Sequence, residues 1–160
     1  MINKEIQELF LDSENSIVTP FNNIAMVFED NSIEHSMLIL RESNYTQIPV
    51  LDYEKKFVGL ISLHQIYRKM GENLFTDFDN LRSLKVRDFI DTHYATINEN
   101  YSLDDVFKLL IDYNFINVIS NDGLYLGMIT RSSVLKKFNF LAHNNKYEFN
   151  IKKEGKWCQY

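Results

Sequence analysis

The sequence of 160 residues contains a single cysteine, Cys158. One cysteine cannot form a disulfide within the chain, and its scarcity is typical of proteins that work in a reducing cytoplasm. The first residues lack the apolar core of a secretory signal peptide, and no apolar run approaches the ~20 residues that a membrane-spanning helix needs. We therefore expect a cytoplasmic protein that does not bind membranes.

Positive charge is also in short supply. The chain carries 17 Lys and Arg against 22 Asp and Glu, which gives a formal net charge of −5 and a pI near 5.3. Such a chain lacks the excess of basic residues that lets a protein bind nucleic acid or anionic lipid without regard to sequence. This charge balance argues against both as partners.

The motifs of common enzyme classes are missing as well. The four histidines show no metal-ligand spacing, and there is no Ser-His-Asp order, no P-loop and no GxGxxG sequence. The acidic pair Asp104-Asp105 follows a helix cap, where the helix dipole already explains it. We therefore expect a binding module with no catalytic residues, no metal and no resident cofactor.

What the sequence does contain is an internal duplication. Residues 31–52 return as residues 101–122 at an offset of 70, and Gly59-Leu60-Ile61-Ser62 returns as Gly127-Met128-Ile129-Thr130 at an offset of 68. This change of offset predicts that the second copy is two residues shorter in the loop between Asp52 and Gly59. Two units cannot form a solenoid, because each needs a neighbour to bury its apolar face. We expect the copies to close on each other, with the ligand site at the seam.

Both copies show the same order of expected elements, namely strand, helix, strand, strand, helix. In the first copy these are residues 24–28, 32–44, 47–51, 57–61 and 62–70. In the second they are residues 95–97, 102–114, 116–120, 124–129 and 131–141. Ser32 begins its helix as an N-cap, whereas Pro49 is tolerated only at a sheet edge or a strand end. The predicted fold class is α/β (α+β), with β-α-β-β-α repeated twice and pseudo-two-fold symmetry.

The domain organisation follows from these patterns. We expect an N-terminal amphipathic helix, a first repeat, a linker, a second repeat and a polar tail, at residues 1–13, 14–70, 71–84, 85–141 and 142–160.

The repeated pattern, with a Gly-x-Ile-Ser/Thr step into the last helix, resembles the CBS domain, and two copies resemble a Bateman module. The segments 31–37 and 44–52, together with Thr130-Arg131 and Val134-Leu135-Lys136, are similar to the cyclic-di-AMP-binding CBS proteins of Gram-positive bacteria, the CbpB/DarB group. The resemblance implies a stand-alone regulatory protein that binds an adenine nucleotide, in the first place cyclic di-AMP. It also implies a protein partner, which is the ppGpp synthetase/hydrolase and, in some members, pyruvate carboxylase.

Two alternatives to this function stay open. One is an AMP- or ATP-sensing CBS protein, and the other is a constitutive adaptor with an empty cleft. Nucleotide-binding CBS domains commonly carry an Asp that holds the ribose hydroxyls, and Gln65 and Ser133 stand at those positions here. That departure favours a cyclic dinucleotide, whose 3′ oxygens are already esterified.

Thr130 and Arg131 stand at the N-terminus of the last helix, where free N–H groups favour phosphate. A cation in the first helical turn opposes the helix dipole by a few tenths of a kcal/mol to ~1 kcal/mol, which is understandable if an anion binds there. The guanidinium fork also suits phosphate oxygens. The alternatives are that Thr130 and Ser133 only cap the helix and that Arg131 is an incidental surface residue. On the phosphate interpretation, removing Arg131 should leave the folding stability unchanged or slightly higher.

The first copy has Ser62-Leu63-His64 at the matching step, with no fixed cation. We therefore predict that the two clefts differ and that one cyclic dinucleotide binds per chain. The small side chain of Ala25 would admit an adenine edge, and the resemblance implies that Tyr45 stacks on the base in an apolar pocket. The residues expected to contact the ligand are Asn23, Ile24, Ala25, Tyr45, Thr46, Gln47, Ile48, Pro49, Thr130, Arg131 and Ser132.

The last helix of each repeat carries more apolar surface than one small unit can bury. The residues concerned are Ile66, Tyr67 and Met70 in the first copy and Val134, Leu135 and Phe138 in the second. We therefore expect a flat two-fold homodimer built from helices of both copies.

Overall fold

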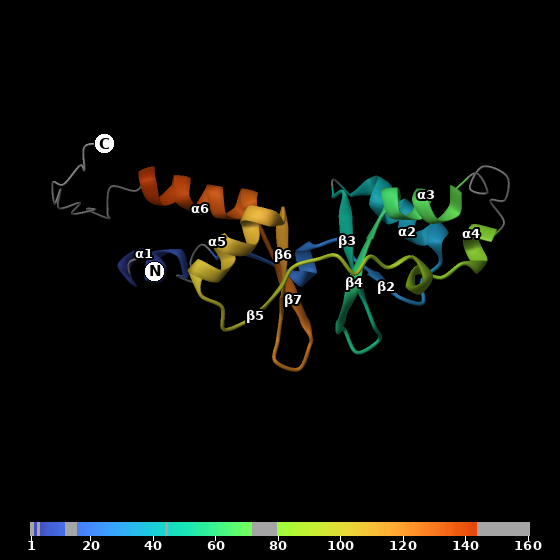
Figure 1. Ribbon diagram of the computed structural model, residues 1–160, viewed down its shortest axis with the longest axis horizontal. Helices are drawn as coiled ribbons and strands as arrows, with labels where there is room; N and C mark the ends of the chain where they lie inside the picture. Colours follow the sequence, from blue (N-terminus) through green and yellow to red (C-terminus); the bar gives the residue numbers. More distant parts are fainter. Residues whose placement is uncertain (1, 3, 12–15, 44, 72–79, 144–160) are drawn as a thin grey trace, which may run out of the picture.

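The structure, a computed structural model, describes all residues except 1, 3, 12–15, 44, 72–79 and 144–160 (Figure 1). Two units lie next to each other along the long axis, and each consists of a small sheet with a pair of helices. In the view of Figure 1 both helix pairs lie on the same side of the molecule. The expected polar tail lies outside the described residues, apart from its first two residues, which end the last helix.

The first unit contains the sheet β2-β3-β4, in which β2 is parallel and β4 antiparallel to the central strand. Two helices accompany it, and both begin at a serine N-cap. The Oγ of Ser32 accepts a hydrogen bond from the backbone N of His35 at 3.2 Å, and that of Ser62 accepts one from Gln65 at 3.0 Å. The elements are β2 (Val27–Phe28), α2 (Ile33–Glu42), β3 (Gln47–Leu51), β4 (Phe57–Ser62) and α3 (Leu63–Met70).

The second unit contains the sheet β1-β7-β6-β5 and repeats the strand–helix–strand–strand–helix order, which confirms the predicted fold class. Its outer strand β1 comes from the start of the chain and is not among the sequence-based expectations. The N-terminal helix α1 (Lys4–Leu11) packs beside this unit. The other elements are β1 (Val18–Pro20), β5 (Thr96–Asn98), α5 (Leu103–Asp112), β6 (Phe115–Ile119), β7 (Tyr125–Thr130) and α6 (Arg131–His143).

The two repeats exchange the segments that precede them. β1 lies ahead of the first repeat in the chain, yet it pairs with β7 of the second unit. Conversely, Leu81 in α4 (Asn80–Ser83), and Val86 and Phe89 in η4 (Val86–Phe89), are buried in the core of the first unit. Asp91 then bridges Leu60 on the outer side of β4. Each packed unit therefore includes residues that the sequence places on the other side of a repeat boundary.

Gly59 and Gly127 are the points at which these exchanged segments come closest to the sheets. A Cβ at Gly127 would lie 2.2 Å from the carbonyl oxygen of Thr19 in β1. A Cβ at Gly59 would lie 2.3 Å from Cγ2 of Ile90 and 2.9 Å from the carbonyl oxygen of Asp91. Both contacts are too short for any side chain, so glycine is required for the same reason in both copies.

The expected position of the two-residue shortening is wrong. The turns between the paired strands, residues 52–56 and 120–124, have the same length. The difference lies in the loop between helix and strand, which spans residues 43–46 in the first copy and 113–114 in the second. The turn sequences could not reveal where the two residues are missing, because a turn with glycine and a turn without it have the same shape here. Lys55 in the first copy adopts the same left-handed conformation (φ 63°) as Gly123 in the second (φ 83°).

The strand expected at residues 24–28 is also reduced, to the two residues of β2, and the expected edge position of Pro49 is wrong. Pro49 lies in the middle of the central strand β3. It is tolerated there because β2 pairs only with Val50 and Leu51, so no partner strand lies beside the missing N–H. In the second copy Asn117 takes this place and donates its backbone N–H to Ala95 at 2.9 Å.

An apolar cluster joins the two units at the seam. Its buried members are Ile24, Leu51, Tyr125 and Met128, and half-buried aromatic and methionine side chains surround them. The hairpins of the two repeats are also joined by backbone hydrogen bonds, since Phe57 donates to Gly123 at 3.2 Å and Tyr125 donates to Lys55 at 2.9 Å. Of the described helices, none has the length and apolar character to cross a membrane.

The first prediction concerns the two glycines. We expect Gly127→Ala to lower the free energy of unfolding by about 3 kcal/mol, because the new methyl meets a backbone oxygen that cannot rotate away. Gly59→Ala should also destabilise the fold, because the new methyl would meet Cγ2 of Ile90, whose β-branched side chain has little freedom to move, and the carbonyl oxygen of Asp91. Gly71→Ala, whose Cβ would meet nothing within 4 Å, is the control for backbone strain alone, because Gly71 adopts a positive φ of 56°. Urea unfolding measures all three, and equal costs at Gly127 and Gly71 would contradict the close approach of β1.

Candidate functional site

The first group of predicted ligand contacts follows the short 3₁₀ helix η2 (Phe21–Asn23). Asn23 ends this helix and is exposed, Ile24 is buried in the seam cluster, and Ala25 packs against the core of the first unit. η2 contacts β7, the strand that ends at Thr130. The structure thus brings this segment next to the strand that leads to the expected phosphate site.

The second group lies in and after the longer helix–strand loop of the first copy. Tyr45 and Thr46 are exposed, and Gln47 is half-buried. Ile48 is different, because it is 0% exposed and lies within the core of the first unit. Its side chain is therefore enclosed by the protein, while Tyr45 and Thr46 present surfaces that a ligand can reach.

Thr130 and Ser133 form a reciprocal cap at the start of α6. The backbone N of Thr130 donates to Oγ of Ser133 at 3.0 Å, and the backbone N of Ser133 donates to Oγ1 of Thr130 at 2.9 Å. This is the geometry of a capping box, so the simple capping role holds for both side chains. Ser132 between them is exposed.

Arg131 has a structural role that the sequence-based argument missed. Its Nε donates to the carbonyl oxygen of Leu110 at 2.8 Å, and its Nη2 donates to that of Ile111 at 2.9 Å. Both carbonyls belong to the last turn of α5, where a helix leaves oxygens unpaired and carries negative partial charge. The unfavourable position of the cation at the start of α6 is therefore offset by α5, without any bound anion.

The backbone at the two candidate base sites differs. In the second copy the carbonyl oxygen of Ala95 accepts from both the backbone N and the Nδ2 of Asn117, at 2.9 and 3.1 Å. In the first copy Pro49 occupies the position of Asn117, and proline has neither donor. The corresponding bonds to Ala25 cannot form, and no described residue donates a hydrogen bond to its carbonyl oxygen.

Sequence reasoning missed Tyr125, which lies in the seam. Its side chain is 3% exposed, and its hydroxyl has no hydrogen-bond partner within the described part of the chain. Burial raises the pKa of this phenol, and nearby Tyr45 adds to the rise. The sequence could have drawn attention to Tyr125, because it and Phe57 both stand two residues before the repeated glycine and differ by one hydroxyl.

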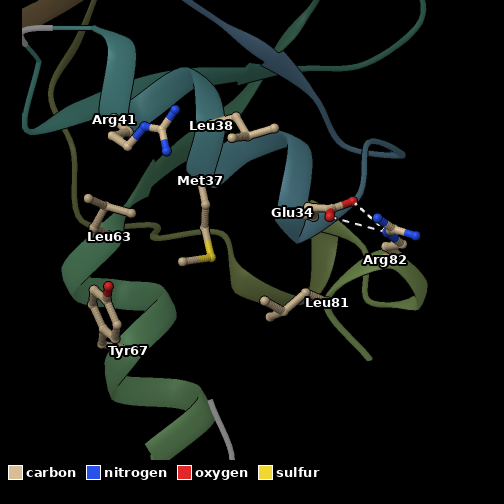
Figure 2. A pocket seen from close by; sticks show the side chains of 8 residues that line it. All are labelled: Glu34, Met37, Leu38, Arg41, Leu63, Tyr67, Leu81 and Arg82. Carbon is tan, nitrogen blue, oxygen red and sulfur yellow. Dashed lines mark hydrogen bonds and ion pairs between the residues drawn. The ribbon is translucent and has the colours of Figure 1, made fainter. Parts of the chain in front are cut away.

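A hollow of about 470 Å³ lies between α2 and α3 of the first unit, with Leu81 and Arg82 of α4 also lining it (Figure 2). Met37 and Leu38 of α2 and Leu63 and Tyr67 of α3 give it apolar walls, and an ion pair between Glu34 and Arg82 closes one end, with Nε and Oε2 3.0 Å apart. None of the predicted ligand contacts lines it. Within the described residues, no three His, Cys, Asp or Glu side chains gather as metal ligands.

Three known proteins are similar to this chain over most of its length. Cyclic di-AMP receptor B of Bacillus subtilis is 27% identical over 139 residues, which are 87% of this chain and 95% of that protein. The structure of CbpB from Streptococcus agalactiae is 30% identical and superposes with a TM-score of 0.82 over 94% of each chain. A structure of CbpB in complex with c-di-AMP is 29% identical, with a TM-score of 0.79 over 90% of this chain and 97% of that one.

The model of the CBS domain matches residues 15–72 and again residues 86–139, well over half of the chain. These two matches cover the two strand–helix–strand–strand–helix repeats. The chain therefore belongs to the CBS domain family and contains a pair of CBS domains.

Proposed function

We propose that this protein is a cytoplasmic regulatory CBS pair that binds cyclic di-AMP, one molecule per chain, and thereby controls a protein partner. The ligand site lies at the seam, between residues 23–25, the loop 43–46 with the start of β3, and the N-terminus of α6. Related chains support the ligand, because one is named a cyclic di-AMP receptor and another is described in complex with c-di-AMP.

One observation carries the choice of cleft, namely the exchange of Asn117 for Pro49. The exocyclic amine of adenine is a donor, and a buried donor must find an acceptor. The carbonyl oxygen of Ala25 is available for it, whereas that of Ala95 already accepts two hydrogen bonds. The longer loop of the first copy adds Tyr45 and Thr46 beside the same position, where a ring can stack on the base.

The phosphates then lie toward the N-terminus of α6. A guanidinium has five N–H donors, and the structure uses two of those of Arg131 on the end of α5. The remaining donors can meet a phosphate oxygen while Arg131 still holds α5. Because no carboxylate stands at Gln65 or Ser133 to hold free ribose hydroxyls, a cyclic dinucleotide fits this site better than AMP or ATP.

Regulation follows from a shift between two populations. The ligand favours one arrangement of the CBS pair, and the protein partner favours the other. By the family resemblance, the ligand-free form engages the ppGpp synthetase/hydrolase. The chain acts as a binding module, and its ligand is bound and released unchanged.

The acting form is a homodimer. Of the residues expected on the dimer surface, Ile66 and Val134 are buried within the chain, whereas Tyr67, Leu135 and Phe138 are exposed. Leu38 in the first unit and Ile111 in the second are exposed apolar residues of the same helix pairs. Both pairs face the same side of the molecule (Figure 1), and Leu38 and Tyr67 also line the hollow of Figure 2. A second copy would cover this surface.

The ligand is tested with a nucleotide panel in calorimetry and thermal shift. Cyclic di-AMP should raise the melting temperature and bind with one site per chain, whereas AMP and ATP should bind more weakly. Analysis of the recovered nucleotide should show that it is unchanged. Absence of binding to every nucleotide would leave the constitutive adaptor, and consumption of a nucleotide would indicate an enzyme.

Arg131→Met separates the two roles of the guanidinium. We expect cyclic di-AMP binding to weaken by about 1.5–3 kcal/mol through loss of a charge-assisted hydrogen bond. We also expect the free energy of unfolding to fall by about 1–2 kcal/mol, because two carbonyls of α5 lose their donor. This corrects the expectation of unchanged or higher stability.

Arg41→Met is the matched control for this test, since that guanidinium lies on the surface of α2 and pairs with the adjacent Glu42. It should change neither binding nor stability appreciably. Loss of stability without loss of affinity in Arg131→Met would place the phosphate elsewhere.

Sedimentation tests the dimer. The 19.0 kDa chain should sediment as a dimer at micromolar concentration, and the double variant Leu135→Glu, Phe138→Glu should sediment as a monomer. Phe140→Glu is the control, because residue 140 points about 200° away from residue 138 around the helix. A monomeric wild type, both with and without ligand, would refute the dimer.

A further inference from the structure

Phe57 and Tyr125 are equivalent residues of the two repeats. Each is the first residue of its strand, and each donates its backbone N–H to the hairpin of the other repeat. Their rings stack with centroids 5.6 Å apart and an interplanar angle of 22°. The two differ by one hydroxyl. Because Phe57 fills its side of the seam with a plain ring, packing alone does not require the hydroxyl of Tyr125.

The hydroxyl of Tyr125 lowers the stability of the folded chain in its present surroundings. The side chain is 3% exposed, and the hydroxyl has no partner among the described residues. The other buried members of its cluster, Ile24, Leu51 and Met128, offer no polar side-chain atom that could accept a strong hydrogen bond. A buried hydroxyl without a partner destabilises a fold, and such groups are rare unless they serve another purpose.

The position of Tyr125 relates it to the proposed base pocket. Ile24, from the segment that leads to Ala25, belongs to the same cluster. Tyr45, the expected stacking residue, is near enough to influence the titration of the Tyr125 phenol. Tyr125 is therefore associated with both segments that the proposed function assigns to the base.

We propose that Tyr125 is a specificity-determining residue whose hydroxyl donates a hydrogen bond to a ring nitrogen of the bound adenine. This inference rests on the proposed function and adds a residue to its site. Burial raises the pKa of the phenol, so the group stays neutral and keeps its proton at physiological pH. A base that enters the seam would give the hydroxyl the partner that it lacks in the free protein.

The test is Tyr125→Phe, which restores the residue found in the first repeat. Calorimetry should show cyclic di-AMP binding about 5–10-fold more weakly, as expected for loss of one hydrogen bond, with an unchanged stoichiometry. The ratio of the dissociation constants for cyclic di-GMP and cyclic di-AMP should become smaller than in the wild type. The melting temperature of the ligand-free protein should stay the same or rise, because an unpaired polar group is removed.

Tyr94→Phe is the matched control. Tyr94 also contacts Phe57, edge to face at 4.9 Å, and loses the same hydroxyl, but it should leave affinity unchanged. If wild type binds cyclic di-AMP and Tyr125→Phe binds it equally well, this inference fails and the proposed function stands. A fall in melting temperature with unchanged affinity would show a purely structural hydroxyl and overturn the inference too. If wild type binds no nucleotide, the proposed function itself fails.

Discussion

The rest of the structure depends on two close contacts, at Gly59 and Gly127. At each glycine, a segment that precedes the other repeat in the chain lies directly against the sheet. At Gly127 the backbone of β1 lies where a Cβ would be, and at Gly59 the segment around Asp91 does. These contacts bind each unit to the chain that precedes the other, so neither repeat has a complete core alone. The seam, and any site at the seam, exists because this exchange holds the two repeats together.

Although the two copies share the same fold, they differ in the hydrogen bonds at the position next to Ala25 and Ala95. The second copy closes its base position with Asn117, whose backbone and side chain both donate to Ala95. The first copy leaves the position open with Pro49 and extends the neighbouring loop. In the proposed ligand site the arginine comes from the second copy, so that proposed site takes residues from both repeats. The two copies share their strands and glycines, whereas Pro49 and Asn117 give the two proposed base positions different hydrogen-bond donors.

Arg131 shows how one cation can satisfy two requirements. A positive charge is unfavourable at the start of α6 and favourable at the end of α5, and the side chain is long enough to reach from one to the other. The dipole of α6 alone does not account for this cation, because its side chain also bonds to the end of a second helix. Ile111, whose carbonyl Arg131 holds, is an exposed apolar residue of the proposed dimer surface. The proposed ligand site and the proposed dimer surface therefore both involve Arg131.

The sequence by itself determined the local structure, since serine caps, apolar periodicity and the repeated glycine steps act over a few residues. The resemblance to the CBS domain was also visible in the sequence, in the repeated order of elements and the Gly-x-Ile-Ser/Thr step into the last helix. The tertiary structure decided what depends on distant partners: the exchange of β1, the burial of Leu81 and Val86 in the first unit, the tolerance of Pro49 in a central strand, and the bonds of Arg131 to α5. The hydroxyl of Tyr125, which has no hydrogen-bond partner among the described residues, belongs to the same class, because its surroundings come from segments far apart in the chain. Local rules fix which element forms, whereas the pairing of groups far apart in the chain is fixed only when the two repeats close on each other.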